Sequence, residues 1–280
     1  MGPPIGVMST STRYRTPESA ASQGLVVRRS VIPLRVSVIG LDGAGKSSTT
    51  LRAIDTLSAR FTVMKPGREP FVIGSGGRHH CLPAASRWVE STFKRADATR
   101  RRGIIGATRL AFIRYQGWLE PHLVTRFRPQ LVVGTRCMII DPAIYSEIYA
   151  PSLARLSLER RLRLFRRYSG LPFRDLYVVL RTPADVAMAR IQARLAKLPA
   201  ATPPAREHWL HLHEQEPILR ELASRFDDAL TTARRLSPFE LVQVDTTRHD
   251  ESSVAALIAA EVQRVCAARG IRPRAPGEEQ

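Results

Sequence analysis

A glycine-rich segment at residues 40–48, GLDGAGKSS, constrains the fold of this chain more than any other feature. It fits the phosphate-binding pattern G-x-x-x-x-G-K-[ST], and an apolar run at residues 34–39 precedes it. Glycines let successive backbone N–H groups turn toward a phosphate chain without Cβ clashes, and the N-terminus of the following helix adds a positive dipole. The order strand, glycine loop, helix therefore predicts a site for the phosphates of a nucleotide.

We expect this loop to hold ATP and Mg²⁺, which are the predicted cofactors. Lys46 would reach the β- and γ-phosphates, and the hydroxyl of Ser47 would be a ligand of the Mg²⁺ that bridges them. The loop residues expected to bind the nucleotide are Gly40, Asp42, Gly43, Ala44, Gly45, Lys46, Ser47 and Ser48.

From residue 34 onward, short apolar runs alternate with helical patterns, as in parallel strands covered by helices. The predicted strands lie at 34–39, 61–64, 130–133, 176–180 and 241–244. The predicted helices lie at 46–59, 104–127, 152–168, 183–197, 208–235 and 251–268. Pro217 is expected to break or kink the fifth helix. The sequence thus predicts an α/β chain with the P-loop NTPase fold, built on a five-stranded parallel sheet with helices on both faces.

The ends of the chain lack the pattern of a packed core. Residues 1–30 are rich in Ser, Thr, Pro and Arg and are interpreted as a disordered leader, although the same composition also fits an organellar transit peptide. Residues 270–280 are interpreted as a disordered tail. Residues 31–269, with the hydrophobic content of a sizeable core, would form one domain.

Composition indicates the cellular compartment of the protein and the kinds of partner that it binds. The three cysteines form no C-x-x-C pair, which suits a reducing compartment and predicts a cytoplasmic location. No apolar stretch reaches about 18 residues, so no membrane partner is expected. The net charge of +18 invites a nucleic-acid interpretation, but an arginine-rich amphipathic helix near residues 156–167 is typical of a solvated face, and a nucleotide enzyme also needs cations. Nucleic acid is therefore not the expected partner.

GTPases, motor ATPases and small-molecule kinases all use such a loop. No N-K-x-D guanine motif occurs in the chain, and Thr135 follows the third strand where a motor ATPase would carry an acidic residue. These two observations favour a kinase.

Further motifs resemble the thymidylate kinase family in type and order, over roughly residues 34 to 268. Asp42 stands where that family has an acidic residue in the loop, and Arg68-Glu69-Pro70 follows the second strand. Arg114-Tyr115-Gln116 on the long helix and Thr135-Arg136 after the third strand come next, with 22 positions between Arg114 and Arg136. Residues 180–187, followed by Arg190 and Arg194, resemble the strand and helix that lead into the family's lid.

The resemblance implies an ATP-dependent nucleoside monophosphate kinase that moves the γ-phosphoryl group to the 5′-phosphate of the acceptor, with dTMP as the leading candidate. The catalytic residues that it implies are Lys46, Arg136, Arg190 and Arg194. The acceptor-binding residues that it implies are Asp42, Arg68, Arg114, Gln116 and Tyr145. It also implies a lid near residues 194–207 within the kinase domain 31–269, and a homodimer, which members of the family commonly form.

Two departures from the family pattern keep alternatives open. Thr135 replaces an acidic residue, for which Asp141 is a replacement at a different offset, and Leu110 stands where a phenylalanine would stack on the base. These changes leave room for a kinase of another small phosphate acceptor on the same scaffold. They also leave room for a nucleotide-binding regulator that has lost transfer chemistry.

Overall fold

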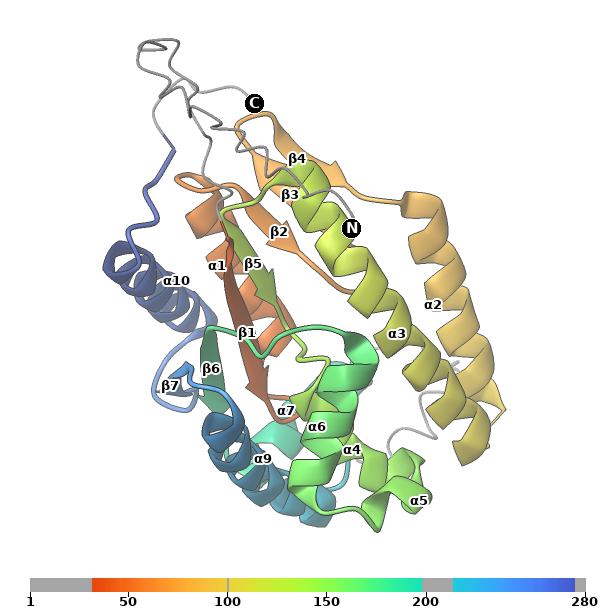
Figure 1. Ribbon diagram of the computed structural model, residues 1–280. Coiled ribbons are helices and arrows are strands. Elements are labelled where there is room, and N and C mark those ends of the chain that lie inside the picture. The colour runs from red at the N-terminus through yellow and green to blue at the C-terminus, as the bar shows by residue number, and fades with distance from the viewer. Residues whose placement is uncertain (1–31, 100, 198–213, 275–280) are drawn as a thin grey trace, which may run out of the picture. The chain divides into compact units, whose positions relative to one another are not determined.

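The computed structural model describes residues 32–99, 101–197 and 214–274. A seven-stranded sheet with the strand order β4-β3-β2-β5-β1-β6-β7 lies at its centre (Figure 1). The strands are β1 Leu34–Gly40, β2 Val63–Lys65, β3 Phe71–Gly74, β4 Gly77–His80, β5 Leu131–Gly134, β6 Leu176–Arg181 and β7 Glu240–Asp245. The helices are α1 Lys46–Ser58, α2 Pro83–Ala98, α3 Arg102–Phe127, α4 Ile140–Tyr149, α5 Pro151–Ala154, α6 Leu158–Ser169, α7 Ala184–Ala196, α9 Glu216–Leu236 and α10 Glu251–Ala268.

The predicted parallel sheet is confirmed. Its five strands are β2, β5, β1, β6 and β7, and each pairs in parallel with its neighbour in that order. The prediction of five strands was too low, because β3 and β4 add an antiparallel hairpin at one edge. All four residues of β4 are exposed, and Gly77-Arg78-His79-His80 has no apolar run by which a strand is recognised.

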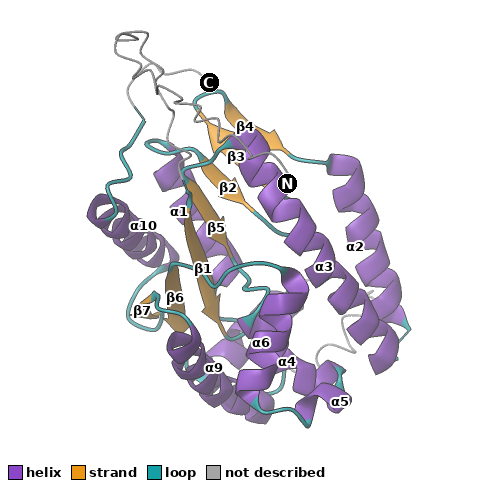
Figure 2. Ribbon diagram, viewed as in Figure 1, coloured by secondary structure: helices purple, strands orange, loops and turns teal. Residues whose placement is uncertain are grey.

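Helices cover both faces of the sheet, as predicted (Figure 2). On one face α1 and α10 pack against the inward side chains of β1, including the fully buried Val36 and Val38. On the other face Ile39 and Tyr177 join a core that α4, α6, α7 and α9 complete. Most residues of β1, β2, β5 and β6 are buried, and strands buried on both sides read as apolar runs in the sequence, whereas β7 is mostly half-buried.

Several helix predictions need correction. The expected helix at 152–168 is divided into α5 and α6, because the side chain of Ser157 caps a new helix by accepting a hydrogen bond from Arg160 N at 3.4 Å. Pro217 does not kink a helix but stands in the first turn of α9, where a proline leaves no hydrogen bond unmade. Residues 208–213 of that predicted helix lie outside the described residues, and α2 was not predicted.

The two predicted disordered ends fall mostly outside the described residues, which begin at 32 and stop at 274. The tail nevertheless packs as far as Arg274, whose N–H donates to Arg60 O at 2.7 Å, while Gln130 Nε2 donates to Arg272 O at 2.6 Å. Among the described helices, none combines the length and the apolar character needed to cross a bilayer.

Candidate active site

The glycine loop joins the end of β1 to the start of α1, and close packing requires two of its glycines. Gly40 and Gly43 have φ values of 149° and 85°. A Cβ on Gly40 would lie 2.7 Å from Leu180 O, and one on Gly43 would lie 2.4 Å from Ala187 O. The backbones of β6 and α7 therefore hold the loop in the open curve that a phosphate chain needs.

Lys46 lies curled over the loop. Its Nζ donates to Gly40 O at 2.8 Å and to Leu41 O at 2.7 Å, and it is 3.3 Å from Asp42 Oδ1. The N-cap of α1 is Gly45, which offers no side-chain cap, so the first N–H groups of α1 point toward an anion site at the helix N-terminus. Both features are those of a loop that binds phosphate.

The three hydroxyl groups at the start of α1 differ in the hydrogen bonds that they make. Those of Ser48 and Thr49 donate to Gly45 O at 3.2 and 2.9 Å. The exposed hydroxyl of Ser47 makes no hydrogen bond with any described residue. Of these three hydroxyls, that of Ser47 is the one without a hydrogen bond to the described residues, and its role as a Mg²⁺ ligand stays a prediction.

A cavity of about 320 Å³ opens at the carboxyl ends of β2 and β5. Its lining comes from the segment after β2, from α2 and α3, and from the segment after β5. The lining residues are Lys65, Pro66, Gly67, Arg68, Glu69, Glu90, Phe112, Gln116, Glu120, Gly134, Thr135, Arg136, Met138 and Arg174. A cavity beside the glycine loop at this edge of a parallel sheet is where α/β proteins place their ligands.

Three cations converge on this cavity. Burial lowers the pKa of Lys65, and repulsion from Arg136 adds to the effect, although Glu69 opposes it. Burial also lowers the pKa of Arg68, followed by repulsion from Arg136. Arg68 is held by an ion pair with Glu90 at 3.1 Å, whereas Arg136 makes no hydrogen bond or ion pair with the described part of the chain. An anion in the cavity would relieve this repulsion.

The floor of the cavity is a buried ion pair. Arg174 donates to both carboxylate oxygens of Glu120, at 2.5 and 2.8 Å, and Arg35 Nε lies 3.5 Å from the same carboxylate. Burial opposes ionisation of Glu120, yet Arg174 and then Arg35 hold the pKa of this carboxyl below its ordinary value. Because the charges of this pair are satisfied within the protein, they form a rigid base rather than a ligand site.

Gln116 positions the wall of the cavity. Its Oε1 accepts from Gly67 N and its Nε2 donates to Gly67 O, both at 3.1 Å. The predicted acceptor-binding residue Gln116 thus reaches the cavity with its amide already committed to the backbone next to Arg68.

Two polar side chains of α4, those of Asp141 and Tyr145, interact with residues of the glycine loop. Tyr145 Oη donates to Asp42 Oδ2 at 3.4 Å, so these two predicted residues do meet. Asp141 accepts a hydrogen bond from Cys137 N at 3.3 Å, and burial raises its pKa from 3.8 to about 6, although attraction to Arg136 and Lys46 lowers it. Asp141 therefore supplies a carboxylate within electrostatic range of both cations, whereas Thr135 at the cavity wall cannot.

Arg114 does not reach the cavity, contrary to the sequence prediction. Its Nη1 donates to Tyr168 O on α6 at 3.2 Å. On an α-helix it lies about 200° around the axis from both Phe112 and Gln116, which do line the cavity. The sequence comparison also pointed to Leu110 at the base position, but Phe112 is the aromatic residue that faces the cavity.

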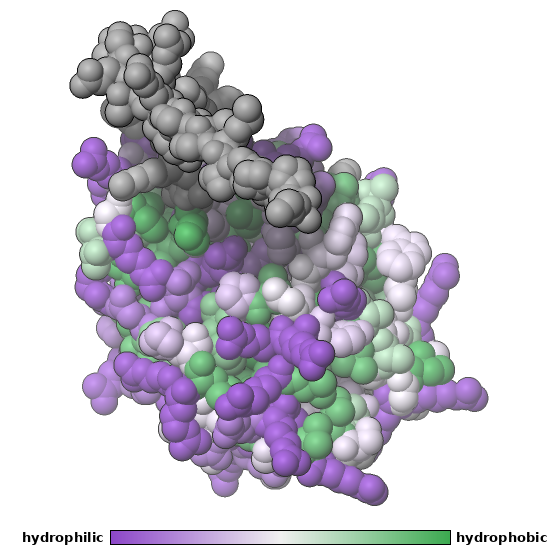
Figure 3. Space-filling view, viewed as in Figure 1, coloured by the Kyte–Doolittle hydropathy of each residue, from purple (hydrophilic) through white to green (hydrophobic). Residues whose placement is uncertain are grey.

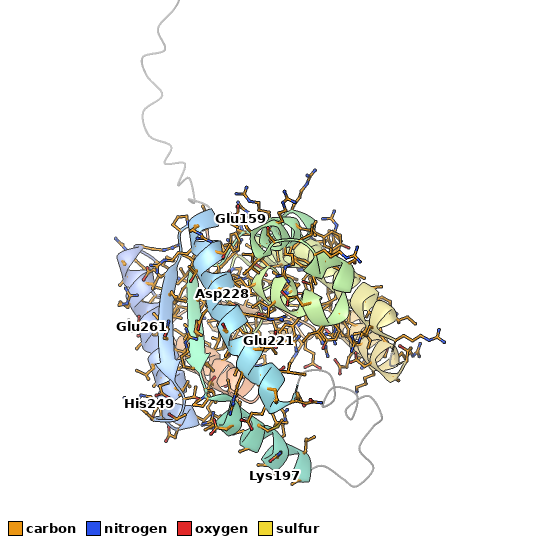
Figure 4. All side chains as sticks on the ribbon, turned by 90° about the horizontal axis from the view of Figure 1, so that it is seen from below. Glu159, Lys197, Glu221, Asp228, His249 and Glu261 are labelled. Carbon is orange, nitrogen blue, oxygen red and sulfur yellow. The ribbon has the colours of Figure 1, made fainter. Side chains whose placement is uncertain are left out.

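The predicted lid arginines lie on α7, which starts beside the glycine loop. Arg190 donates to Thr246 Oγ1 at 3.0 Å and to Thr246 O at 2.8 Å, and Arg194 pairs with Glu214 at 3.5 Å. Lys197 marks the end of this helix in Figure 4. Most of the predicted lid, residues 198–207, lies outside the described residues.

Sequence reasoning missed Lys65, Glu90 and Phe112. Lys65 directly follows the second predicted strand, 61–64, and is the last residue of β2, so its position at the carboxyl edge could have been predicted from the sequence. Phe112 stands four residues before Gln116, the spacing of one helix face. Glu90 gave no such signal because α2 itself was not predicted.

A glycine loop after β1, a cavity at the carboxyl ends of β2 and β5 and the parallel order β2-β5-β1-β6-β7 are the architecture of the P-loop NTPase fold, as the sequence predicts. Among solved structures, deoxyadenosine kinase from M. mycoides with the products dCMP and a flexible dCDP bound is similar, with a TM-score of 0.53 and 15% identity over 82% of this chain and 100% of that chain. The same enzyme with bound dCTP gives a TM-score of 0.50, with the same identity and coverage. No protein-family model and no curated protein matches the chain.

At this identity the likeness establishes the fold and leaves the acceptor open. The resemblance to thymidylate kinases is accordingly supported at the level of the P-loop fold and not at the level of that family.

Proposed function

We propose that this protein is an ATP-dependent phosphotransferase whose acceptor is a nucleoside monophosphate, with dTMP as the leading candidate. The observation that carries the proposal is the guanidinium of Arg136. It lies in the cavity wall, within electrostatic range of Asp141 by the glycine loop and of Arg68 across the cavity, and has no partner among the described residues. A phosphate-bearing acceptor supplies the anion that this arrangement lacks.

The chemistry requires two phosphate groups of like charge to come together. Lys46 would leave its loop carbonyls to hold the donor phosphates, while the N-terminus of α1 binds them through N–H groups. Arg68, fixed by Glu90 and by its stacking 4.0 Å from the ring of Phe93, would hold the acceptor phosphate. Mg²⁺ held by Ser47 would neutralise charge on the donor phosphates.

Arg136 would bridge the two sites, because it has room to turn toward either phosphate. The reaction needs positioning and charge compensation more than covalent help from the protein. Arg190 and Arg194 remain proposed catalytic residues on the lid side. They would have to leave Thr246 and Glu214 to reach the phosphates, which fits a closing movement when both substrates are bound.

A deoxynucleoside kinase is the second candidate, and the similarity in fold to deoxyadenosine kinase favours it. Such a reaction needs a base to take the proton of a 5′-hydroxyl. Glu69 and Glu90 line the same cavity and are the carboxylates available for that task. The two candidates differ in whether the acceptor carries a phosphate.

Binding of dTMP and thymidine to the wild type and to Arg136→Gln, measured by calorimetry, separates them. The proposal expects dTMP to bind the wild type at least about tenfold more tightly than thymidine, since a phosphate held by arginine adds charge-assisted hydrogen bonds. Arg136→Gln should reduce that difference, although Arg68 still holds the acceptor phosphate, and should leave the affinity for thymidine unchanged. Equal affinities for the two ligands in the wild type would favour the nucleoside kinase, and no affinity for either would favour another acceptor or a regulator.

A further inference from the structure

The outward face of α6 carries arginines that the candidate active site does not use. Arg160, Arg163 and Arg167 are exposed and lie three and four residues apart, so they leave the helix on one side. Glu159 is the one acidic residue of α6, and its pair with Arg163 at 2.7 Å lies on the surface, where such pairs contribute little. The side chains of Arg160 and Arg167 have no hydrogen bond or ion pair with any described residue.

The arginine stripe continues into a groove at the end of the helix. This open groove has a volume of about 490 Å³. Its lining residues are Arg163, Arg166, Arg167, Gly170, Leu171 and Pro172. Since no acidic residue lines it, the groove extends a positively charged track beyond α6.

Two exposed aromatic rings stand next in sequence to the residues where α3 and α6 meet. The two backbones touch there, because a Cβ on Gly117 would lie 1.7 Å from Ser169 O. The neighbouring rings of Trp118 and Tyr168 are 61% and 38% exposed. Trp118 is also stacked on His122, with ring centres 5.6 Å apart and planes only 9° apart. In Figure 3, hydrophilic side chains drawn purple alternate with hydrophobic ones on the side of the molecule where Figure 1 places α6.

We propose that this surface, the α6 face, formed by Arg160, Arg163, Arg167, Trp118 and Tyr168, binds single-stranded nucleic acid. Guanidinium groups bind backbone phosphates, and exposed aromatic rings stack on bases that are free of a partner strand. The net charge of +18 adds attraction for any polyanion. This proposal reverses the expectation from composition, because three exposed arginines share one side of α6 and two exposed aromatic rings lie near the contact of α6 with α3.

A second copy of the chain fits the α6 face less well. A two-fold axis through the face would set its arginine stripe against the same stripe of the other copy. Arg160 and Arg167 would then meet like charges without acidic partners, which opposes association. A polyanion satisfies the same arginines directly.

The test uses the full-length protein and a fluorescently labelled oligo(dT) of about 20 nucleotides, with anisotropy measured over a series of KCl concentrations. Arg160→Gln and Arg167→Gln are combined in one variant. The matched control combines Arg52→Gln and Arg248→Gln, which remove the same charge from arginines already paired with Glu251 and Asp245. Both variants therefore have the same net charge, and they differ in which part of the surface has lost positive charge.

The α6 variant should lower the slope of log affinity against log salt by about 1.4, since each phosphate contact on a single strand contributes about 0.7. The control should keep the slope of the wild type. Trp118→Ala should weaken oligo(dT) binding about tenfold through lost stacking, with competition by inorganic polyphosphate unchanged because polyphosphate has no bases.

Three results would overturn the proposal. One is the absence of oligo(dT) binding at about 0.1 M salt, where non-specific binders of this kind still bind. Another is an equal loss of slope in both double variants, which would mean that binding depends on the net charge of the protein and not on the α6 face. The third is a dimer in sedimentation that Trp118→Ala dissociates while oligo(dT) does not, which would assign the α6 face to self-association.

Discussion

Replacing Asp141, whose carboxyl group is buried, with a residue that cannot ionise should raise the free energy of unfolding by an amount that depends on pH. Burial raises its pKa from 3.8 to about 6, even with the attraction of Arg136 and Lys46 included. At about 1.4 kcal/mol for each pKa unit, the ionised form costs the folded state about 3 kcal/mol above pH 6. Between the two pKa values the folded state binds more protons than the unfolded state, so stability falls as pH rises through this window.

Asp141→Asn keeps an oxygen to accept from Cys137 N but never ionises. It should therefore be more stable than the wild type by about 3 kcal/mol at pH 8 and by roughly 1.5 kcal/mol at pH 5. Urea denaturation of both proteins at the two pH values gives the differences. Asp228→Asn, an exposed change on α9, is the matched control and should stay within about 0.5 kcal/mol at both. If Asp141→Asn instead loses stability at pH 8, or shows the same difference at both pH values, this electrostatic reasoning is wrong.

Three other variants test the glycine loop and the cavity floor. Gly43→Ala and Gly45→Ala both place a side chain at positive φ, which costs about 1–2 kcal/mol in each variant. Only the Cβ added at Gly43 meets a carbonyl, since it would lie 2.4 Å from Ala187 O, whereas the Cβ added at Gly45 would lie 3.8 Å from its nearest atom. ATP affinity should therefore fall far more for Gly43→Ala, and equal losses would contradict the packing described. Lys46→Ala should abolish phosphoryl transfer measured as ADP release, and retained transfer would remove the loop from the mechanism. Glu120→Gln should lower the free energy of unfolding, measured by urea denaturation, by about 3–5 kcal/mol, because Arg174 is left buried without its partner. Glu90→Gln, which breaks the half-exposed pair with Arg68, is the control and should cost less than about 1 kcal/mol. Similar costs for the two variants would contradict the importance of the buried pair.

The parts of this fold that the sequence predicted are those with local signals. The glycine loop is a motif of consecutive residues, and strands buried on both faces appear as apolar runs such as residues 34–39. In the hairpin of β3 and β4, the apolar run of β3 is only three residues long, and β4 has none because it is exposed along its length. Short edge strands are defined by their pairing, which a single sequence does not display.

The cavity was harder to predict because it depends on which way helices face. Apolar residues occur almost all the way round α3, so periodicity did not show whether Phe112 or Arg114 points at the cavity. The electrostatic attraction between Asp141 and Lys46 joins residues far apart in the chain, and only the tertiary structure brings them together. Arg136 was predicted to be a site residue because Thr135-Arg136 stands after the third predicted strand, where the thymidylate kinase family has Asp-Arg.

Transfer of label from γ-³²P ATP tests the central proposal most directly, with each common nucleoside, deoxynucleoside and their monophosphates offered in turn to the purified protein and to Lys46→Ala. The account predicts labelled nucleoside diphosphate from at least one monophosphate, with dTMP first, no labelled product from the nucleosides, and none from Lys46→Ala. Label appearing in a monophosphate made from a nucleoside, with none from the monophosphates, would contradict it and establish the deoxynucleoside kinase instead.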